Sequence, residues 1–210
     1  MSCLFVISAP SGAGKTSVIR TLLQTDINLT LSISYTTRPS RRDEKNGHDY
    51  FFVDHATFKD MQARGEFLES AEVHGNLYGT SRKWIEKTMA AEQDVLLEID
   101  CQGAQQIRTL YPQAASIFIL PPSIEALKQR LEQRGQDENK VIERRLAAAR
   151  SEISHVNRFD YVVVNHELET AARDVASIVQ AERLKTIRQL VRQRSLIADT
   201  SARQAAFPDC

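Results

Sequence analysis

The sequence predicts an α/β fold in which helices cover both faces of a parallel sheet, giving a three-layer core. Short, nearly continuous apolar runs alternate with segments of helical spacing, which is typical of parallel strands buried on both sides. The expected strands cover residues 4–7, 95–99, 116–120 and 161–164. Helical spacing follows at residues 16–23, 102–110 and 168–190.

Two stretches break this alternation. Residues 32–81 turn polar, with aromatic and β-branched residues at 50–53 and turn signals at Asn46-Gly47 and Gly75-Asn76, which predicts an insertion of mainly antiparallel strands. Residues 123–158 are arginine-rich with helical spacing, and Gly135 interrupts them, so a hairpin of two helices is expected. We therefore expect core segments at 1–31, 84–122 and 158–195, the insertion at 32–83, a helical lid at 123–157 and a flexible tail at 196–210.

Bulk composition excludes some classes of protein. The 210 residues carry 27 basic and 27 acidic side chains, so no field of one sign attracts nucleic acid or a membrane surface. No apolar run reaches the roughly 18 residues that a membrane span needs. Cys3, Cys101 and Cys210 lack the spacing of a metal site or a disulfide framework. We expect a cytoplasmic protein with free thiols.

The strongest local signal is a Gly-rich turn between the first expected strand and the first helix. Residues 9–16 match G-x-x-x-x-G-K-[ST], except that the small residue Ala9 replaces the first glycine. Such a turn presents backbone N–H groups to an anion, and the helix N-terminus adds partial positive charge. Lys15 would reach the β- and γ-phosphates of a nucleotide, and Thr16 would offer its hydroxyl to magnesium. An accidental Gly-rich turn is the alternative, which the flanking strand and helix disfavour.

Several further motifs occur in a fixed order, at residues 34–41, 46–53, 65–69, 75–80 and 97–104. Together with the Gly-rich turn, they resemble the guanylate kinases over about residues 4–165. The resemblance implies a phosphate-loop kinase core, a GMP-binding insertion and a lid. It also implies transfer of the γ-phosphoryl group of ATP to GMP, and to dGMP, with Mg²⁺ held mainly by phosphates and water. The ATP site would comprise Ala9, Pro10, Ser11, Gly12, Ala13, Gly14, Lys15, Thr16 and Ser17.

Paired arginines in the insertion predict a phosphate monoester site. Arg38 and Arg41 supply two guanidinium groups, and Tyr50 and Tyr78 could add hydroxyls from other strands, each charge-assisted hydrogen bond contributing roughly 1.5–3 kcal/mol. The resemblance assigns these four residues to the phosphate of GMP and adds Glu44 to the substrate site. A solvated basic face is the alternative, and it is the interpretation we prefer for the neighbouring Arg42.

Guanine differs from adenine by donating at N1 and N2 and accepting at O6. The resemblance places Glu69 and Asp100 against the donor edge and Ser34 and Thr80 near O6. As isolated residues, Glu69 and Thr80 would be ordinary surface positions. A site built on such hydrogen bonds rejects adenine because a mismatched polar group costs about 1–3 kcal/mol.

Two carboxylates follow a buried strand. Glu98 and Asp100 flank Ile99, so we expect both side chains on one face of the sheet, at the crevice where α/β proteins bind ligands. One of them could orient magnesium-bound water. A structural role, such as capping the next helix, is the alternative, more so for Glu98 than for Asp100.

The helical lid carries candidate catalytic cations. Arg130 and Arg134 are four residues apart on one helical face, and Arg145 lies on the next helix. The resemblance implies that these arginines act with Lys15 and Arg38 on the charge of the transferred phosphoryl group. They could instead balance nearby glutamates. Asn165 matches a family position near the adenine of ATP, or is a plain turn residue.

Other functions remain open at this point. A related kinase with a ribose-phosphate acceptor would leave Ser34, Glu69 and Thr80 without a base to recognise. A non-catalytic guanylate-kinase-like interaction module would not need Lys15 and Thr16. We expect only small-molecule nucleotide partners, and a homo-oligomer through the terminal helix is an arrangement that its amphipathic pattern allows.

Overall fold

The computed structural model describes residues 2–73, 75–133 and 139–198. Its larger sheet has five strands in the order β2-β7-β1-β8-β9, and every neighbouring pair is parallel. The predicted α/β class and parallel sheet are confirmed. One strand, β2, has no counterpart in the sequence prediction. The strands are β1 (Leu4–Ser8), β2 (Leu29–Leu31), β7 (Asp94–Glu98), β8 (Ala115–Leu120) and β9 (Tyr161–Val164).

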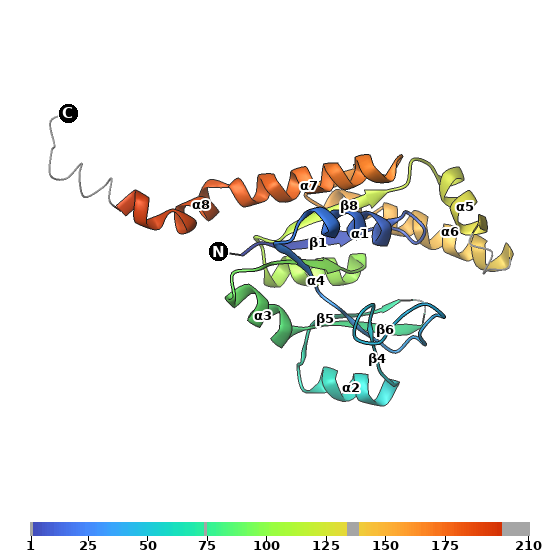
Figure 1. Ribbon diagram of the computed structural model, residues 1–210. Helices are drawn as coiled ribbons and strands as arrows, with labels where there is room; N and C mark the ends of the chain where they lie inside the picture. The colour runs from blue at the N-terminus through green and yellow to red at the C-terminus, as the bar shows by residue number, and fades with distance from the viewer. Residues whose placement is uncertain (1, 74, 134–138, 199–210) are drawn as a thin grey trace, which may run out of the picture.

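Helices cover both faces of this sheet, as Figure 1 shows with α7 above it and α4 below it. Phe5 and Ile7 of β1 pack with residues of α1 (Lys15–Thr25) and α7 (Leu168–Leu184). The alternate residues Leu4 and Val6 pack against α3 (Arg82–Ala90) and α4 (Cys101–Leu110). Because successive strand residues point to opposite faces, one apolar run supplies two cores.

The second sheet has four strands in the order β4-β3-β6-β5 and lies below the first in Figure 1. Its β3–β6 and β6–β5 pairs are antiparallel and its β3–β4 pair is parallel, so the sheet is mixed. The strands are β3 (Tyr35–Thr36), β4 (Phe51–Phe52), β5 (Phe67–Val73) and β6 (Asn76–Ser81).

One helix inside this part of the chain has no counterpart in the sequence prediction, which expected mainly antiparallel strands there. Helix α2 (His55–Ala63) begins at Asp54, whose side chain accepts a hydrogen bond from the backbone N–H of Thr57 at 2.7 Å. Its residues Phe58 and Met61 pack against Phe67 and Leu77 of the second sheet.

The expected helical hairpin is formed by α5 (Ile124–Gln133) and α6 (Asn139–Ile153), followed by the short 3₁₀ helix η1 (Val156–Arg158). A small core of Leu127, Leu131, Ile142 and Ala149 holds the two helices together. Gly135 and Arg134 lie outside the described residues.

The single helix predicted at residues 168–190 is wrong, because α7 ends at Leu184 and α8 (Thr186–Arg192) follows. Lys185 between them has an extended backbone, with φ −54° and ψ 136°. The break buries the side chain of Arg188 in the protein interior. There its Nη2 donates to the carbonyl oxygen of Gln113 at 3.0 Å and lies 3.6 Å from Oε2 of the buried Glu182. Residues 194–198 are also helical, so helical structure reaches into the segment expected at 196–210, of which residues 199–210 lie outside the described chain. Within the described chain, every helix is too short or too polar to span a lipid bilayer.

Candidate active site

The Gly-rich turn joins the carboxyl end of β1 to the first residue of α1. Gly12 and Gly14 have φ angles of +88° and +93°, in the left-handed region that side chains with a β-carbon rarely adopt. No side chain caps the N-terminus of α1, and no acidic residue occupies its first turn. The loop and the helix therefore leave backbone N–H groups and a partial positive charge for an anion.

Two side chains bind the backbone of this loop. Nδ2 of Asn165 donates to the carbonyl oxygen of Ala13 at 2.7 Å, and Nη1 of Arg130 donates to the same oxygen at 3.3 Å. Nη2 of Arg130 also donates to the backbone carbonyl of Asn165 at 3.0 Å. Asn165 is buried, and a β-carbon on Gly14 would lie 2.4 Å from its Nδ2. The Asn165 side chain thus contacts the loop itself.

The neighbouring strand β7 brings oxygen ligands to the start of α1. The hydroxyl of Thr16 donates to Oε1 of Glu98 at 2.7 Å, and Nζ of Lys15 donates to the carbonyl oxygen of Ile99 at 3.1 Å. One hydroxyl and one carboxylate suit Mg²⁺, which takes few protein ligands and keeps phosphate oxygens and water. Among the described residues, no group of three or more His, Cys, Asp or Glu side chains could hold a metal ion.

Glu98 and Asp100 line one cavity, as expected, but only Glu98 belongs to the strand. Strand β7 ends at Glu98, and Asp100 is the N-cap of α4. Its Oδ1 accepts a hydrogen bond from the backbone N–H of Gly103 at 2.9 Å. The capping role that the sequence suggested for Glu98 therefore belongs to Asp100.

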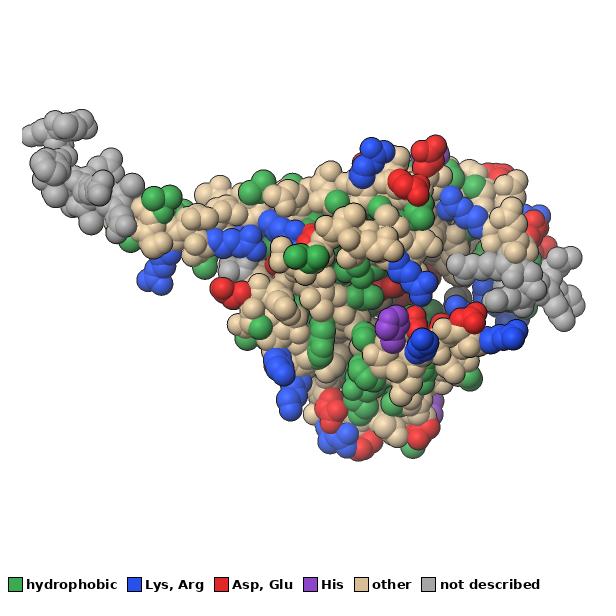
Figure 2. All heavy atoms as spheres, in the orientation of Figure 1, with side chains coloured by type: hydrophobic (Ala, Val, Ile, Leu, Met, Phe, Trp, Pro, Cys, Tyr) green, Lys and Arg blue, Asp and Glu red, His purple; other side chains and the backbone are tan. Residues whose placement is uncertain are grey.

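One cavity joins the phosphate loop to the second sheet. Figure 2 shows the molecule hollowed between the α5–α6 hairpin and the second sheet, with charged side chains around the opening. The cavity lies at the carboxyl end of β7 and brings together residues that were predicted for both nucleotide sites. Its walls are Lys15, Ser34, Tyr50, Glu69, Ala71, Val73, Tyr78, Glu98, Ile99 and Asp100.

A carboxylate holds the Arg38 side chain and the backbone at Arg41. Nη1 and Nη2 of Arg38 each donate to an oxygen of Glu44 at 2.9 Å, and the backbone N–H of Arg41 donates to Oε2 of Glu44 at 2.8 Å. Burial opposes the charges of Arg38 and Glu44, but their mutual hydrogen bonds hold the pKa of Arg38 above its ordinary value and the pKa of Glu44 below its own. The guanidinium of Arg38 also lies 5.4 Å from the ring centre of Tyr50, and burial raises the pKa of that phenol.

A hydrogen-bond chain lies deeper in the same cavity. The hydroxyl of Thr80 donates to Oε1 of Glu69 at 2.6 Å, and the hydroxyls of Thr80 and Ser34 are 3.5 Å apart. Glu69 is only 4% exposed. Burial raises the pKa of Glu69 to about 7, although the Thr80 hydrogen bond lowers it. A guanine edge could supply the missing donors to this carboxylate.

Two glutamines of α4 fix the strand that carries Glu69. Nε2 of Gln106 donates to the carbonyl oxygen of Ser70 at 2.9 Å, and Oε1 of Gln106 accepts from the backbone N–H of Ser70 at 3.2 Å. Nε2 of Gln102 donates to the carbonyl oxygen of Glu72 at 3.2 Å. Strand β5 is therefore bonded to α4 along one edge. These contacts could not be predicted from the sequence, because helical spacing does not indicate which distant strand a side chain meets.

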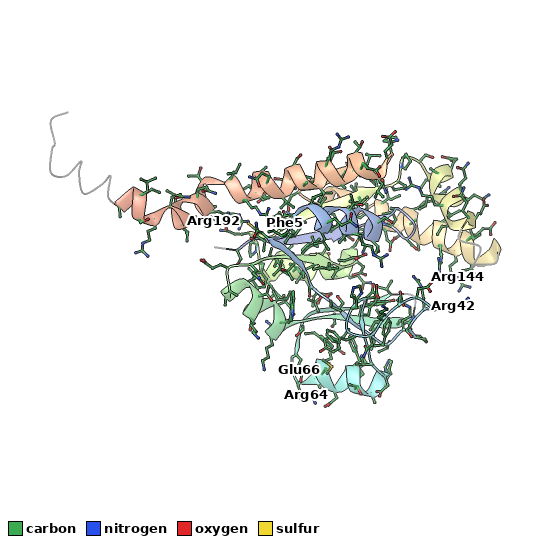
Figure 3. All side chains as sticks on the ribbon, viewed as in Figure 1. Phe5, Arg42, Arg64, Glu66, Arg144 and Arg192 are labelled. Carbon is green, nitrogen blue, oxygen red and sulfur yellow. The ribbon has the colours of Figure 1, made fainter. Side chains whose placement is uncertain are left out.

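The α5–α6 hairpin presents arginines toward the opening. Arg145 lies on α6 and is partly exposed, while Arg134 is outside the described residues. Figure 3 shows Arg144 of α6 and Arg42 of the second sheet's loop on facing sides of the opening.

One acidic residue of α6 was not singled out from the sequence. The carboxyl of Glu152 faces the backbone N–H of Ser11 in the phosphate loop, and its Oε2 is buried without a hydrogen-bond partner among the described residues. Burial raises the pKa of Glu152, while Ser11 and the charge of Lys15 act in the opposite direction. No local pattern in the sequence marks Glu152, since its partner lies 141 positions away (152 − 11).

Comparisons with known proteins agree in one family. The family model described as guanylate kinase matches residues 1–182. The chain is 97% identical over 201 residues to a guanylate kinase of Nitrosomonas europaea, covering 96% of this chain and all of that protein. It is 55% identical to a guanylate kinase of Nitrosospira multiformis, covering 93% of each chain. The crystal structure of guanylate kinase from Anaplasma phagocytophilum superimposes with a TM-score of 0.75, at 38% identity and 89% coverage of each chain.

Proposed function

The chain belongs to the guanylate kinase family, and we propose that it transfers the γ-phosphoryl group of ATP to GMP in the cavity at the carboxyl end of β7. The reaction of this family of nucleoside monophosphate kinases yields ADP and GDP. The observation that carries the proposal is the wall of one cavity, where Lys15 of the phosphate loop lies with Glu69 and Tyr78 of the second sheet. A triphosphate and a monophosphate would therefore meet at the same opening.

We assign the triphosphate to the turn between β1 and α1. Backbone N–H groups of residues 11–17 would hold the phosphates, and Lys15 would neutralise the charge of the β- and γ-phosphates. Thr16 would hold Mg²⁺, and Glu98 would orient its water ligands, since the two side chains already lie 2.7 Å apart. When bound, Mg²⁺ supplies charge neutralisation to the transferred group. Asn165 would act on ATP through the loop, because its side chain contacts Ala13.

We assign the acceptor to the second sheet. Arg38, whose side chain Glu44 holds, and Arg41, whose backbone Glu44 holds, would bind the phosphate of GMP together with the hydroxyls of Tyr50 and Tyr78. In the deeper part of the cavity, the guanine base would meet Glu69 and Asp100 on its donor edge. Ser34 and Thr80 would lie near its O6 atom. We also propose dGMP as an acceptor, since it carries the same base and phosphate.

Catalysis in this arrangement needs no general base. The phosphate of GMP is ionised near neutral pH, so positioning and charge neutralisation lower the barrier. Arg130 supports the loop and α5 together, and Arg134 and Arg145 would approach the transferred group as the lid closes. Cations aimed at this group contribute about 10³–10⁵ in rate in comparable enzymes.

A coupled assay with GMP, AMP, dTMP and ribose phosphates as acceptors tests the assignment. We expect GMP to be strongly preferred, because a ribose-phosphate kinase would have no use for the Glu69–Thr80 pair. Lys15→Ala should abolish most turnover, whereas a non-catalytic interaction module would show no turnover to lose. Equal turnover of AMP and GMP would contradict the role of the base pocket.

Two further assignments concern the whole molecule. We propose a homo-oligomer through the C-terminal helices, which expose Leu184, Ile187, Leu190 and Val191 by half or more of their surfaces. Sedimentation velocity of the wild type and of Leu190→Ser would test it, with loss of the larger species expected in the variant. We also propose a cytoplasmic location, which the free thiols of Cys3 and Cys101 support.

A further inference from the structure

A glycine in the first turn of α4 lies against the carboxylate that we assign to guanine. Gly103 is buried, and a β-carbon on it would lie 2.4 Å from Oε2 of Glu69 and 3.0 Å from its Cδ. Real β-carbons do not approach other atoms at 2.4 Å. The Glu69 carboxylate therefore occupies the space that the side chain of any other residue at position 103 would fill.

The backbone of Gly103 does not itself require glycine. Its φ lies outside the left-handed region, unlike the φ angles of Gly12 and Gly14 in the phosphate loop. Alanine is a better helix former than glycine, so glycine in this helix lowers local stability. After the two Glu69 atoms, the next nearest atom to the added carbon is Cδ1 of Ile99, at 3.3 Å. The conflict with Glu69 is the closest one.

Strand β5 is unable to move away without losing contacts. The two hydrogen bonds between Gln106 and the backbone of Ser70 and the bond from Gln102 to Glu72 fix β5 on α4. An added carbon at Gly103 would consequently displace the Glu69 side chain and leave the strand in place. That displacement would also pull Oε1 of Glu69 from the hydroxyl of Thr80.

We propose that Gly103 determines acceptor specificity as a positioning residue, because its missing side chain lets Glu69 face the base pocket. This inference rests on the proposed function, in which Glu69 accepts hydrogen bonds from N1 and N2 of guanine. Gly103 touches neither substrate in this account. Its effect on GMP passes entirely through the place of the Glu69 carboxylate.

The test is the steady-state kinetics of Gly103→Ala with GMP and with inosine monophosphate, which lacks the 2-amino group of guanine. Loss of a hydrogen bond to a charged group corresponds to about tenfold or more, so the KM for GMP should rise by about that factor. The preference for GMP over inosine monophosphate should shrink, while the KM for ATP stays within about twofold. The melting temperature should fall by no more than a few degrees, since the better helix propensity of alanine partly offsets the loss of the Glu69–Thr80 hydrogen bond. Thr109→Ala, on an exposed position of the same helix, is the control and should leave all of these values unchanged.

A double-mutant cycle separates this inference from the assignment of Glu69. In a Glu69→Ala background, Gly103→Ala should add less than about twofold to the KM for GMP, because the carboxylate that it displaces is absent. An unchanged KM in Gly103→Ala, or an equally large effect without Glu69, would overturn the role of Gly103 alone. An unchanged KM in Glu69→Ala would overturn the role of Glu69 and, with it, that of Gly103.

Discussion

Both terminal nitrogens of Arg38 donate to the carboxylate of Glu44, each at 2.9 Å, so the guanidinium is held in one orientation before any ligand arrives. The same carboxylate accepts from the backbone N–H of Arg41 at 2.8 Å. One acidic residue thus orders the side chain of Arg38 and the backbone at Arg41. Such preorganisation removes the entropic cost of ordering the long Arg38 side chain when the substrate binds.

Removing the charge of Glu44 should weaken acceptor binding. In Glu44→Gln, Arg38 loses two charge-assisted hydrogen bonds, and the KM for GMP should rise about tenfold while the KM for ATP stays constant. The control is Glu66→Gln in the exposed pair with Arg64, also on the second sheet's side of the molecule (Figure 3), where an effect below about twofold is expected. Tighter GMP binding in Glu44→Gln would mean that Glu44 competes with the phosphate, contrary to the account.

The raised pKa of Glu69 predicts a specific dependence of stability on pH. The folded protein binds a proton at Glu69 between its ordinary pKa of about 4.5 and its folded value of about 7, while the unfolded chain does not. The contribution of this group to stability is therefore complete below about pH 4.5 and is lost as pH rises through 7, by about 3 kcal/mol. Urea unfolding of the wild type and of Glu69→Gln at pH 5 and pH 8 measures it. The free energy of unfolding of Glu69→Gln should rise relative to that of the wild type between pH 5 and pH 8. A difference in unfolding free energy that is the same at both pH values would contradict the raised pKa of the buried carboxylate.

Asn165 should stabilise the phosphate loop without determining whether the protein prefers ATP or GTP as phosphoryl donor. Asn165→Ala removes a buried hydrogen bond to the carbonyl oxygen of Ala13, which should lower the free energy of unfolding by about 1–3 kcal/mol and raise the KM for ATP. The ratio of turnover with ATP to turnover with GTP should not change. His166→Ala, next in the chain and exposed, serves as the control. A changed base preference would instead favour a contact between Asn165 and adenine.

Thr16 should affect the requirement for magnesium. Thr16→Val keeps the shape of the side chain but removes the hydroxyl that lies 2.7 Å from Glu98, so half-maximal activity should need about tenfold more free Mg²⁺. Thr25→Val near the other end of α1, where the hydroxyl bonds only the carbonyl oxygen of Leu22 in the described structure, should leave the Mg²⁺ dependence unchanged. An unaltered Mg²⁺ titration in Thr16→Val would rule out this metal ligand.

The fold class and the parallel core follow from local patterns. Strand β1 is buried at every position, and apolar at all but Ser8, because both of its faces are covered. Its next residues form a turn that requires glycine at two positive φ angles. Helix α2 was missed even though Asp54 is an N-cap with Phe58 and Met61 on one helical face, because strand signals on both sides dominated. The break at Lys185 was missed because the apolar spacing of α7 continues across it, and only the distant partners of Arg188 fix the turn.

The candidate site was likewise predictable from the sequence only in part. Residues 9–16 are contiguous, so one sequence motif is enough to predict that they bind phosphate. Glu69 and Gly103 lie 34 positions apart (103 − 69), and neither position suggests that the carboxylate of one fills the space beside the other. The Glu152–Ser11 contact and the capping role of Asp100 are likewise products of tertiary packing and strand length. Such relationships depend on the register of the two sheets, which local sequence does not specify.

The most direct test of the central claim is a crystal structure of the protein with GMP, Mg²⁺ and a non-hydrolysable ATP analogue. The account predicts that the phosphate of GMP lies within about 2.7–3.2 Å of nitrogen atoms of Arg38 and Arg41, with the base on Glu69 and the triphosphate on the turn that ends at Lys15. A monophosphate bound away from both arginines, or a base that does not reach Glu69, would contradict it.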